Sequence, residues 1–311
     1  MKVLVTGATG FIGSKLVQVL KSNSEDVVTF SRSGSDYCYD ITDNFDWQPI
    51  LKGVDVVVHL AGRAHLVNDS VDNPLEEFRR VNNDATVRLA KNCVASGVKR
   101  FIYFSSLGVH EGLFGEQKIS PDMELCPISD YAISKAESEI SLSEVVIKSS
   151  SMDLVVIRPP LVFSHNAPGN FARLLKLVDF LPIIPFGSFD NQKSFVHLDN
   201  LVDFTYRCIT YPRKLNGPFI CSESEDIKFH NLIKSLSYGI KNRNVNFRFP
   251  RSFLRFVFFI FGKKALLDKL VGTLTVDSSK CSEVLNWQAK GKIEESIEFS
   301  GRAYKVKNDG R

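Results

Sequence analysis

Thr6-Gly7-Ala8-Thr9-Gly10-Phe11-Ile12-Gly13 is the stretch of this chain with the strongest structural signal. It follows Lys2-Val3-Leu4-Val5, an apolar run that predicts a buried strand. After it, Leu16, Val17 and Leu20 recur at helical spacing with polar residues between them. The order of strand, glycine turn and helix is the context that a dinucleotide-binding turn requires.

Each glycine of this turn has a physical role. Gly7 allows a tight turn, Gly10 lets the backbone approach a pyrophosphate, and Gly13 lets the helix lie close to the sheet. Free N–H groups at the start of the helix would face the phosphate charge. The spacing is G-x-x-G-x-x-G rather than G-x-G-x-x-G, so an ordinary tight turn stays open as the alternative. The predicted cofactor contacts of the turn are Gly7, Gly10, Phe11, Ile12 and Gly13.

Composition excludes several classes of protein. The chain has 311 residues and a formal net charge of +4, too small to favour nucleic acid as a partner. Its six cysteines are scattered without a C-x-x-C pair, which indicates reduced thiols and neither a disulfide framework nor a metal site. Because the predicted strand begins at the N-terminus, we expect no signal peptide and a cytoplasmic protein.

Apolar runs and helical patterns alternate through the first half of the chain. The apolar runs predict strands at 27–30, 54–60, 100–104 and 153–158, and a long helical pattern covers 75–95. Such alternation is typical of a parallel sheet with helices on both faces. We therefore predict an α/β protein with a Rossmann-type doubly wound parallel sheet and a smaller C-terminal substrate-binding lobe.

The regular alternation fades after Pro159-Pro160. Residues 1–160 are predicted to form an NAD(P)-binding domain, and residues 161–311 a substrate-binding lobe that partly shares its core. Ligands of such sheets bind at the carboxyl ends of the strands. Unusual residues follow the predicted strands at these ends, namely Gly7, Ser31, Ala61-Gly62 and Ser105-Ser106.

Tyr131-Ala132-Ile133-Ser134-Lys135 is the second strong signal. On a helix, positions i and i+4 lie on one face, so the phenol and the ammonium group point the same way. A nearby cation favours the phenolate, and we expect it to lower the pKa of Tyr131. Lys135 could also hold the hydroxyl groups of a nicotinamide ribose, and Ser106 could hydrogen-bond a substrate oxygen. Taken alone, the Y-x-x-x-K pattern also occurs on solvated helix faces.

On these residues the chain resembles the extended short-chain dehydrogenase/reductase family, in its branch of nucleotide-sugar epimerases, dehydratases and reductases. The resemblance extends from residue 1 to about residue 290. Such enzymes have a Rossmann fold, use NAD(P) and act on sugars carried by a nucleotide diphosphate, here most simply UDP; homodimers are usual among them. The matching motifs are TGATGFIG (6–13), HLAG (59–62), FSSLGV (104–109), YAISK (131–135), RPPLVF (158–163) and KSFVHLDNLVD (193–203).

The resemblance also implies roles for individual residues. The implied catalytic residues are Ser106, Tyr131 and Lys135, with Ser105 as an alternative to Ser106. The implied further cofactor contacts are Asp40, Ile41, Leu60, Ala61, Gly62, Asn82, Tyr131, Lys135 and Pro159. The candidate substrate contacts are Ser105, Ser106, His65, Asn170 and Lys193. Lys193 stands where these enzymes often have an arginine, so it keeps the charge but loses the bidentate fork.

The end of the second predicted strand bears on the choice of cofactor. It reads Phe30-Ser31-Arg32-Ser33, without the acidic residue that would bind an adenosine 2′-hydroxyl. An arginine there attracts a 2′-phosphate, so Arg32 favours NADP(H). NAD(H) stays the alternative, with Arg32 stacked on the adenine or in solvent.

A reductase uses a fresh hydride in each turnover, which suits NADPH. The stretches AGRAH (61–65) and PLEEFRRVN (74–82) also resemble a surface-polysaccharide branch that contains 4-keto-sugar reductases. Our first hypothesis, which that resemblance implies, is reduction of C4 of a UDP-4-keto-6-deoxy-N-acetylhexosamine for surface polysaccharide synthesis, with Tyr131 as proton donor and Ser106 polarising the carbonyl. The alternative is a 4-epimerase of UDP-glucose or UDP-N-acetylhexosamine with the same residues. An inactive NADP-sensing regulator is less favoured, because Ser106, Tyr131 and Lys135 are all retained.

Phe253-Leu254-Arg255-Phe256-Val257-Phe258-Phe259-Ile260-Phe261 is the unusual feature of the second half. It is too short to span a membrane, which takes about 20 apolar residues. Basic neighbours such as Arg251, Lys263 and Lys264 would suit an interfacial helix on an anionic membrane. A core helix of the lobe and a dimer surface stay open as alternatives.

Overall fold

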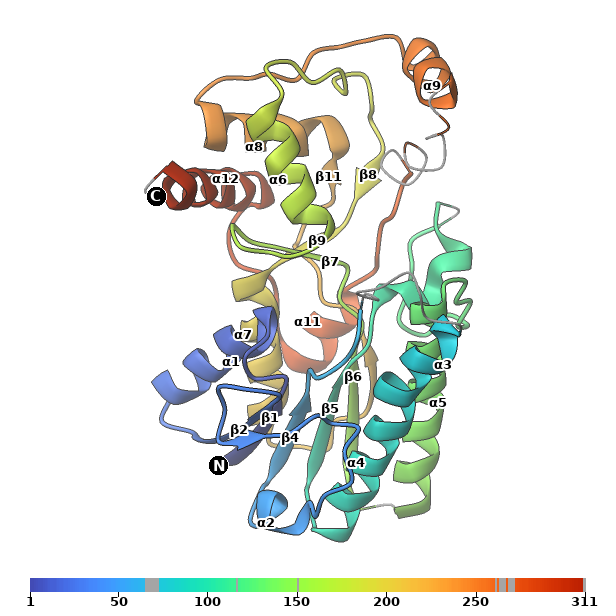
Figure 1. Ribbon diagram of the computed structural model, residues 1–311, viewed down its shortest axis with the longest axis vertical. Helices are drawn as coiled ribbons and strands as arrows, with labels where there is room; N and C mark the ends of the chain where they lie inside the picture. Colours follow the sequence, from blue (N-terminus) through green and yellow to red (C-terminus); the bar gives the residue numbers. More distant parts are fainter. Residues whose placement is uncertain are drawn as a thin grey trace.

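The protein is built around one seven-stranded parallel sheet with the strand order β10-β6-β5-β4-β1-β2-β3 (Figure 1). This confirms the predicted doubly wound Rossmann-type fold. The strands are β1 (Lys2–Thr6), β2 (Asp26–Ser31), β3 (Tyr37–Cys38), β4 (Val56–His59), β5 (Arg100–Phe104), β6 (Asp153–Ile157) and β10 (Gly217–Phe219). The structure is a computed structural model that describes residues 1–64, 73–115, 117–149, 151–260, 262, 267 and 272–309.

Helices cover both faces of this sheet (Figure 1). One face carries α1 (Phe11–Ser22), α7 (Leu198–Thr210) and α11 (Ser279–Leu285). The other carries α4 (Ala85–Ala95) and α5 (Asp130–Ser149), with α2 (Gln48–Leu51), α3 (Pro74–Arg79) and the π-helical turn η1 (Arg80–Asp84) beside them. Side chains alternate between the faces of a strand, so Val3 and Val5 pack toward α1 and α7 while Leu4 packs toward α4.

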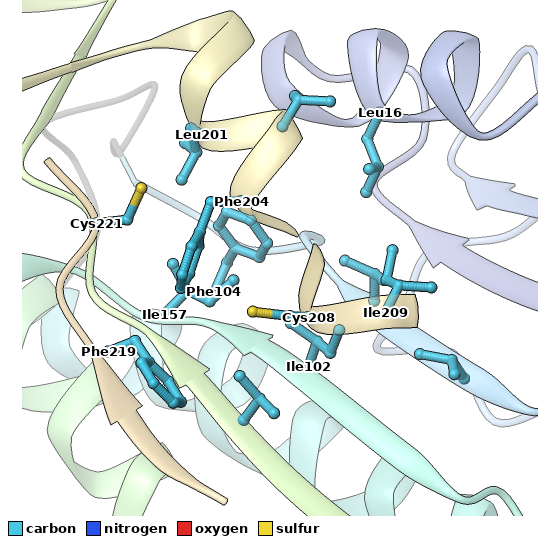
Figure 2. Packing of buried hydrophobic residues seen from close by; sticks show 14 of the residues in the cluster. Leu16, Ile102, Phe104, Ile157, Leu201, Phe204, Cys208, Ile209, Phe219 and Cys221 are labelled. Atoms are coloured by element: carbon cyan, nitrogen blue, oxygen red, sulfur yellow. The ribbon is translucent and has the colours of Figure 1, made fainter. Parts of the chain in front are cut away.

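The core on the α1 and α7 side is formed from distant parts of the chain (Figure 2). Leu16 of α1 and Leu201 of α7 contribute to it, and Cys208 and Cys221 lie within it as buried free thiols. The ring of Phe204 lies 5.0 Å from that of Trp287, between ring centres. Residues beyond 200 therefore help to cover the large sheet.

A second, smaller core belongs to a lobe above the carboxyl ends of the strands (Figure 1). Its elements are β7 (Leu161–Phe163), α6 (Asn170–Phe180), β8 (Gln192–Lys193), β9 (Phe195–His197), β11 (Ile227–Lys228), α8 (Phe229–Lys241), α9 (Arg251–Ile260) and α12 (Ile293–Asp309). Two glycines let α8 and α12 approach closely, since a Cβ on Gly239 would lie 2.2 Å from the carbonyl oxygen of Glu298. Among the residues that the structure describes, none of the helices is long and apolar enough to cross a membrane.

The predicted division at residue 160 stays a prediction. Residues 161–311 do not lie wholly in the lobe, because β10 joins the sheet beside β6, and α7 and α11 pack on its face. The chain thus passes from the sheet to the lobe and back more than once. The sheet and the lobe are therefore joined by several connections rather than by one.

The glycine turn after β1 packs closely against the loop after β4 and against α1. Gly7 has a φ of +68°, and its N–H donates to the carbonyl of Phe30 at 2.8 Å. A Cβ on Gly7 would lie 2.7 Å from the backbone nitrogen of Ala61, and a Cβ on Gly13 would lie 2.1 Å from the carbonyl oxygen of Gly7. The backbones of the turn, the loop after β4 and α1 therefore touch directly, which leaves no room for side chains.

Gly13→Ala is expected to lower the free energy of unfolding by about 1–3 kcal/mol, because the added methyl group displaces α1 from the turn. Urea denaturation measures the loss. Ser14→Ala, a change at the exposed next residue of α1, serves as the control and should leave stability nearly unchanged. Equal stability of the two variants would contradict the required close approach.

Candidate active site

A cleft of about 590 Å³ lies where the carboxyl ends of β4, β5 and β6 meet the lobe. The predicted site residues that line it are Phe11, Ile12, Leu60, Gly62, Ser105, Ser106, Tyr131, Lys135, Pro159, Asn170 and Lys193. Other predicted residues lie outside its lining, namely Gly7, Gly10, Gly13, Arg32, Asp40, Ile41, Ala61 and Asn82. His65 lies outside the described residues.

Tyr131 and Ser106 come together in this cleft. Tyr131 lies in the first turn of α5, and Ser106 ends the extended segment after β5, where it caps the 3-10 helix η2 (Leu107–Leu113). Burial raises the pKa of Tyr131, and a hydrogen bond with Ser106 opposes that rise only in part. The expected lowering of this pKa is thus wrong for the ligand-free chain, because burial outweighs the effect of neighbouring groups.

Lys135 is buried beside these two residues, with 6% of its surface exposed. Its ammonium group donates to the carbonyl of Phe104 at 2.8 Å and lies 4.7 Å from the ring centre of Tyr103. Burial lowers the pKa of Lys135 to about 8, although the charge of Glu139 opposes this. The amine is therefore fixed in position and titrates close to neutral pH.

The N-terminus of α1 and the loop after β4 have the shape that a dinucleotide needs. Gly10 precedes α1 and offers no side-chain cap, so no side chain covers the first N–H groups of the helix, and Phe11 and Ile12 line the cleft. Gly62 keeps the loop bare, since a Cβ there would lie 3.4 Å from the Lys135 ammonium nitrogen. These uncovered backbone groups fit a bound pyrophosphate and ribose.

Asn82 fastens this loop to α5. Its Oδ1 accepts a hydrogen bond from the N–H of Arg63 at 2.8 Å, and its Nδ2 donates to the carbonyl of Arg63 and to Oγ of Ser134, both at 3.0 Å. The side chain is fully buried and sits in the π-helical turn η1. A π-helical turn inserts a residue into a helix and is common at functional sites. Asn82 thus holds the loop rather than facing the cleft.

His59 supports the same loop from below. Its ring nitrogens bond the hydroxyl groups of Thr6 at 2.7 Å and Thr86 at 2.8 Å, which joins β1, β4 and α4. Burial lowers the pKa of His59 to about 3, so the ring stays neutral. His59 therefore has a structural role, because it joins these elements behind the loop.

Opposite charges meet where an adenosine would lie. Hydrogen bonds from Thr42 and the charges of Arg32 and Arg80 lower the pKa of Asp40, even though burial alone would raise it. Asp40 is therefore ionised at neutral pH. Its negative charge offsets the attraction of Arg32 for a 2′-phosphate, so this region is less cationic than Arg32 alone implies.

The lobe side of the cleft carries Lys193 and Asn170. Lys193 lies in β8, and burial lowers its pKa to about 8. Asn170 begins α6 directly after Gly169, whose φ is +70°. Across the cleft, the buried hydroxyl of Ser105 makes no hydrogen bond with any described residue. Polar groups thus face the space from both sides.

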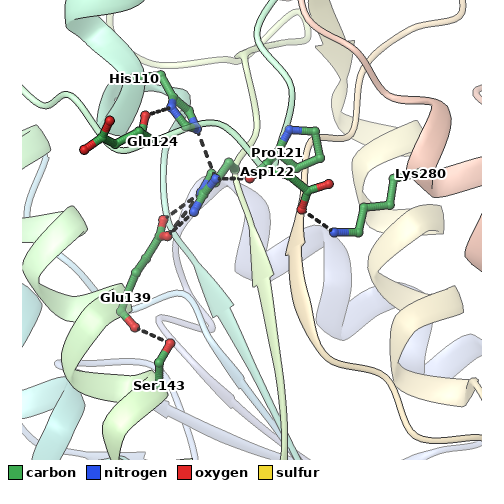
Figure 3. A network of polar contacts seen from close by, with 8 residues as sticks. His110, Pro121, Asp122, Glu124, Glu139, Ser143 and Lys280 are labelled. Carbon is green, nitrogen blue, oxygen red and sulfur yellow. Dashed lines mark hydrogen bonds and ion pairs between the residues drawn. The ribbon is translucent and has the colours of Figure 1, made fainter.

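A buried ion pair behind the site was not predicted from the sequence. Arg158, next to Pro159, donates to both carboxylate oxygens of Glu139 at 2.5 to 3.1 Å. It also donates to Nε2 of His110 at 3.0 Å and to the carbonyl of Pro121 at 2.7 Å (Figure 3). Since arginine only donates, Nε2 of His110 accepts, and its Nδ1–H donates to the Glu124 carbonyl at 3.0 Å.

This network ties three elements of the site together. Glu139 lies one turn after Lys135 in α5, His110 lies in η2 after Ser106, and Arg158 follows β6. Within the described part of the chain, no three His, Cys, Asp or Glu side chains are placed to hold a metal ion.

Comparison with known proteins gives one family. A family model described as the NAD dependent epimerase/dehydratase family matches residues 3–220. A Vibrio cholerae protein named UDP-glucose 4-epimerase is 34% identical over 317 residues, covering 99% of this chain and 96% of that protein.

Two further proteins match this chain, one by its sequence and one by its fold. An Escherichia coli O157:H7 protein, N-acetyl-alpha-D-glucosaminyl-diphospho-ditrans,octacis-undecaprenol 4-epimerase, is 30% identical over 211 residues, covering 65% of this chain and 61% of that protein. The crystal structure of UDP-glucuronic acid 4-epimerase from Bacillus cereus in complex with NAD has a TM-score of 0.79 at 22% identity, over 100% of this chain and 99% of that one. The second match concerns the fold.

Glu139→Gln is expected to lower the free energy of unfolding by about 3–5 kcal/mol, because it leaves the buried Arg158 without its counter-charge. Chemical denaturation measures this loss. Glu144→Gln, at an exposed position of the same helix, is the matched control and should have little effect. Similar values for the two variants would mean that the ion pair contributes nothing to the fold.

Proposed function

This chain belongs to the NAD-dependent epimerase/dehydratase family, and on that premise we propose that it is a UDP-sugar 4-epimerase acting on UDP-glucose or a UDP-N-acetylhexosamine. Family membership confirms the resemblance found in the sequence and makes the chain a nucleotide-sugar enzyme of the NAD-dependent epimerase/dehydratase type. The observation that carries the finer proposal is the cleft itself, in which a phenol–hydroxyl pair faces a lobe wall with a half-buried lysine, Lys193.

The comparisons favour the epimerase, whereas the sequence alone favoured the reductase. The reductase came first there, largely because of Arg32. The Vibrio cholerae relative, which matches 99% of this chain, is named a 4-epimerase, and the family model is described as NAD dependent. Both support the epimerase and the use of NAD.

Tyr131 is the residue that exchanges a proton with the sugar in this proposal. The raised pKa of Tyr131 keeps its phenol protonated at neutral pH, and Ser106 is hydrogen-bonded to the phenol. The positive charge of an oxidised nicotinamide beside the phenol would lower the pKa of Tyr131. The phenol could then act as the base for the C4 hydroxyl and later return the proton. Ser106 can hold the same oxygen through its hydroxyl group.

The cofactor would lie along the sheet edge, held by groups of this chain. The N–H groups of Phe11 and Ile12 suit its pyrophosphate, and Gly62 and Lys135 border the ribose side. When bound, NAD supplies the hydride acceptor and donor that oxidation and re-reduction of one sugar carbon need. Lys135 keeps a cation at this place, since its amine is fixed to the Phe104 carbonyl.

Epimerisation also requires the sugar to present its opposite face to the same donor. Anchoring the diphosphate while the sugar turns meets this need, and Lys193 with Asn170 could supply the anchor on the lobe. The diphosphate is thus held at one wall and the reacting carbon at the other.

A 4-keto-sugar reductase that uses NADPH is the second candidate. The observation in its favour is the end of β2, where Arg32 stands without an acidic neighbour in sequence. The ionised Asp40 close to Arg32 weakens that argument. The same catalytic residues serve both reactions, so the two differ in whether reduced cofactor is consumed.

Purified protein is expected to interconvert UDP-glucose and UDP-galactose, or the corresponding N-acetylhexosamine pair, without added cofactor. Chromatography of the sugar nucleotides measures the conversion. Tyr131→Phe should lower turnover about a hundred- to ten-thousand-fold, because no group then exchanges the proton.

The controls separate chemistry from binding. Tyr131→Phe should bind NAD as the unchanged protein does, and Tyr238→Phe, at an exposed site outside the cleft, should keep full activity. Stoichiometric NADPH consumption with a 4-keto sugar, together with no interconversion, would replace the epimerase by the reductase. Unchanged turnover of the Tyr131 variant would remove that residue from the mechanism.

Binding of UDP is expected to weaken as the pH rises through about 8. Lys193 is charged below its pKa of about 8 and neutral above it, so its attraction for a diphosphate is lost on the alkaline side. The dissociation constant should rise by up to about tenfold per pH unit there, as calorimetry can measure. Lys193→Arg keeps its charge and should flatten the profile. A profile unchanged by that substitution would assign the titration to another group, such as Lys135.

A further inference from the structure

Exposed aromatic side chains gather on the lobe around α9. Six apolar side chains of this segment are exposed by 40% to 67%, and together we call them the aromatic face: Phe247, Phe249, Phe253, Phe256, Phe259 and Ile260. Large exposed apolar surfaces mark contact with a partner or a membrane. We propose that the aromatic face docks on the surface of an anionic lipid bilayer.

α9 presents these side chains on one side. At about 100° per residue, Phe253, Phe256, Phe259 and Ile260 fall within an arc of about 120°. Leu254 points to the far side and is buried in the core of the lobe. The helix is therefore attached by one face and offers the opposite face to solvent. Leu254 thus joins the core of the lobe, while the exposed rings of the described residues lie on the other side of the helix.

Contacts at the start of α9 hold the aromatic face in place. Arg251 donates to the carbonyl of Ser188 and to the carboxylate of Asp190, both at 2.5 Å. The ring centres of Phe249 and Phe253 are 5.3 Å apart, so the segment before the helix and the helix itself form one surface. A docking surface fixed in this way loses little conformational entropy on binding.

The charge of this part of the chain complements an anionic surface. Residues 247–267, the segment that carries the aromatic face, contain five Lys or Arg and no Asp or Glu, although the whole chain carries only +4. The rest of the chain is therefore net negative. Arg248 and Arg255 alternate with the phenylalanines in sequence and are exposed. Apolar rings flanked by cations are the composition of an interfacial helix on anionic lipid.

The same charges disfavour a second copy of the chain as the occupant. A twofold dimer through the aromatic face would bring the patch against itself, so Arg248 and Arg255 would approach like charges. A bilayer with anionic headgroups instead neutralises them, and it accepts phenylalanine rings that have no polar atom to satisfy. The surface thus fits a lipid interface better than its own copy.

The proposal concerns membrane attachment alone and stands whether the enzyme is an epimerase or a reductase.

Flotation with large unilamellar vesicles tests the proposal with the full chain. The protein is expected to float with vesicles of phosphatidylcholine and phosphatidylglycerol at low salt, and far less with phosphatidylcholine alone or at high salt. Phe256→Ser should weaken binding about tenfold or more, because one ring no longer enters the interface. Arg248→Gln and Arg255→Gln should each weaken it about fivefold.

Phe299→Ser is the matched control, since Phe299 on α12 is 63% exposed and Phe256 is 59% exposed. This control should bind like the unchanged protein, and circular dichroism should report the same fold for every variant. Binding that is equal on phosphatidylcholine alone, or unaffected by Phe256→Ser, overturns the proposal. So does a protein that ignores vesicles and passes from dimer to monomer when Phe256 is replaced, which would make the aromatic face an interface between copies.

Discussion

The direct backbone contact among the glycine turn, the loop after β4 and α1 is the constraint on which the site depends. The carbonyl of Gly7 occupies the space where a side chain of Gly13 would stand, and the backbone of Ala61 does the same for Gly7. Because no side chain intervenes, the first N–H groups of α1 and the loop that ends at Gly62 form one continuous surface. Every group proposed to meet the cofactor is positioned relative to that surface.

α5 carries the proposed reacting groups, Tyr131 and Lys135, beside this surface. The helix is fixed by three separate contacts, through the bonds of Asn82, the carbonyl of Phe104 and the ion pair between Glu139 and Arg158. Each contact comes from a different stretch of the chain, and each ends near the phenol or the amine of α5. The reacting groups are therefore held by interactions that lie behind them and leave the cleft free.

The sequence predicted what depends on local pattern. The alternating runs predicted the parallel sheet through their periodicity. Most of the residues that meet in the cleft were implied by the resemblance to a known family, through its motifs. The predicted lowering of the pKa of Tyr131 was wrong, because burial raises this pKa and depends on the whole fold rather than on the spacing to Lys135. The partners of Arg158 and the π-helical turn at Asn82 were missed for the same reason. Likewise, Asp40 near Arg32 is a tertiary arrangement that adjacent residues could not reveal.

The close crossing of α8 and α12 has a consequence for biosynthesis. Ile293 and Ile297 of α12 belong to the core of the lobe, and the crossing depends on Gly239 and Gly301. A nascent chain that has just released β10 already contains all the strands of the large sheet, yet the lobe still lacks this side of its core. The lobe can mature only after residues 293–309 have left the ribosome, so apolar surfaces of α8 remain uncovered during the last stage of translation.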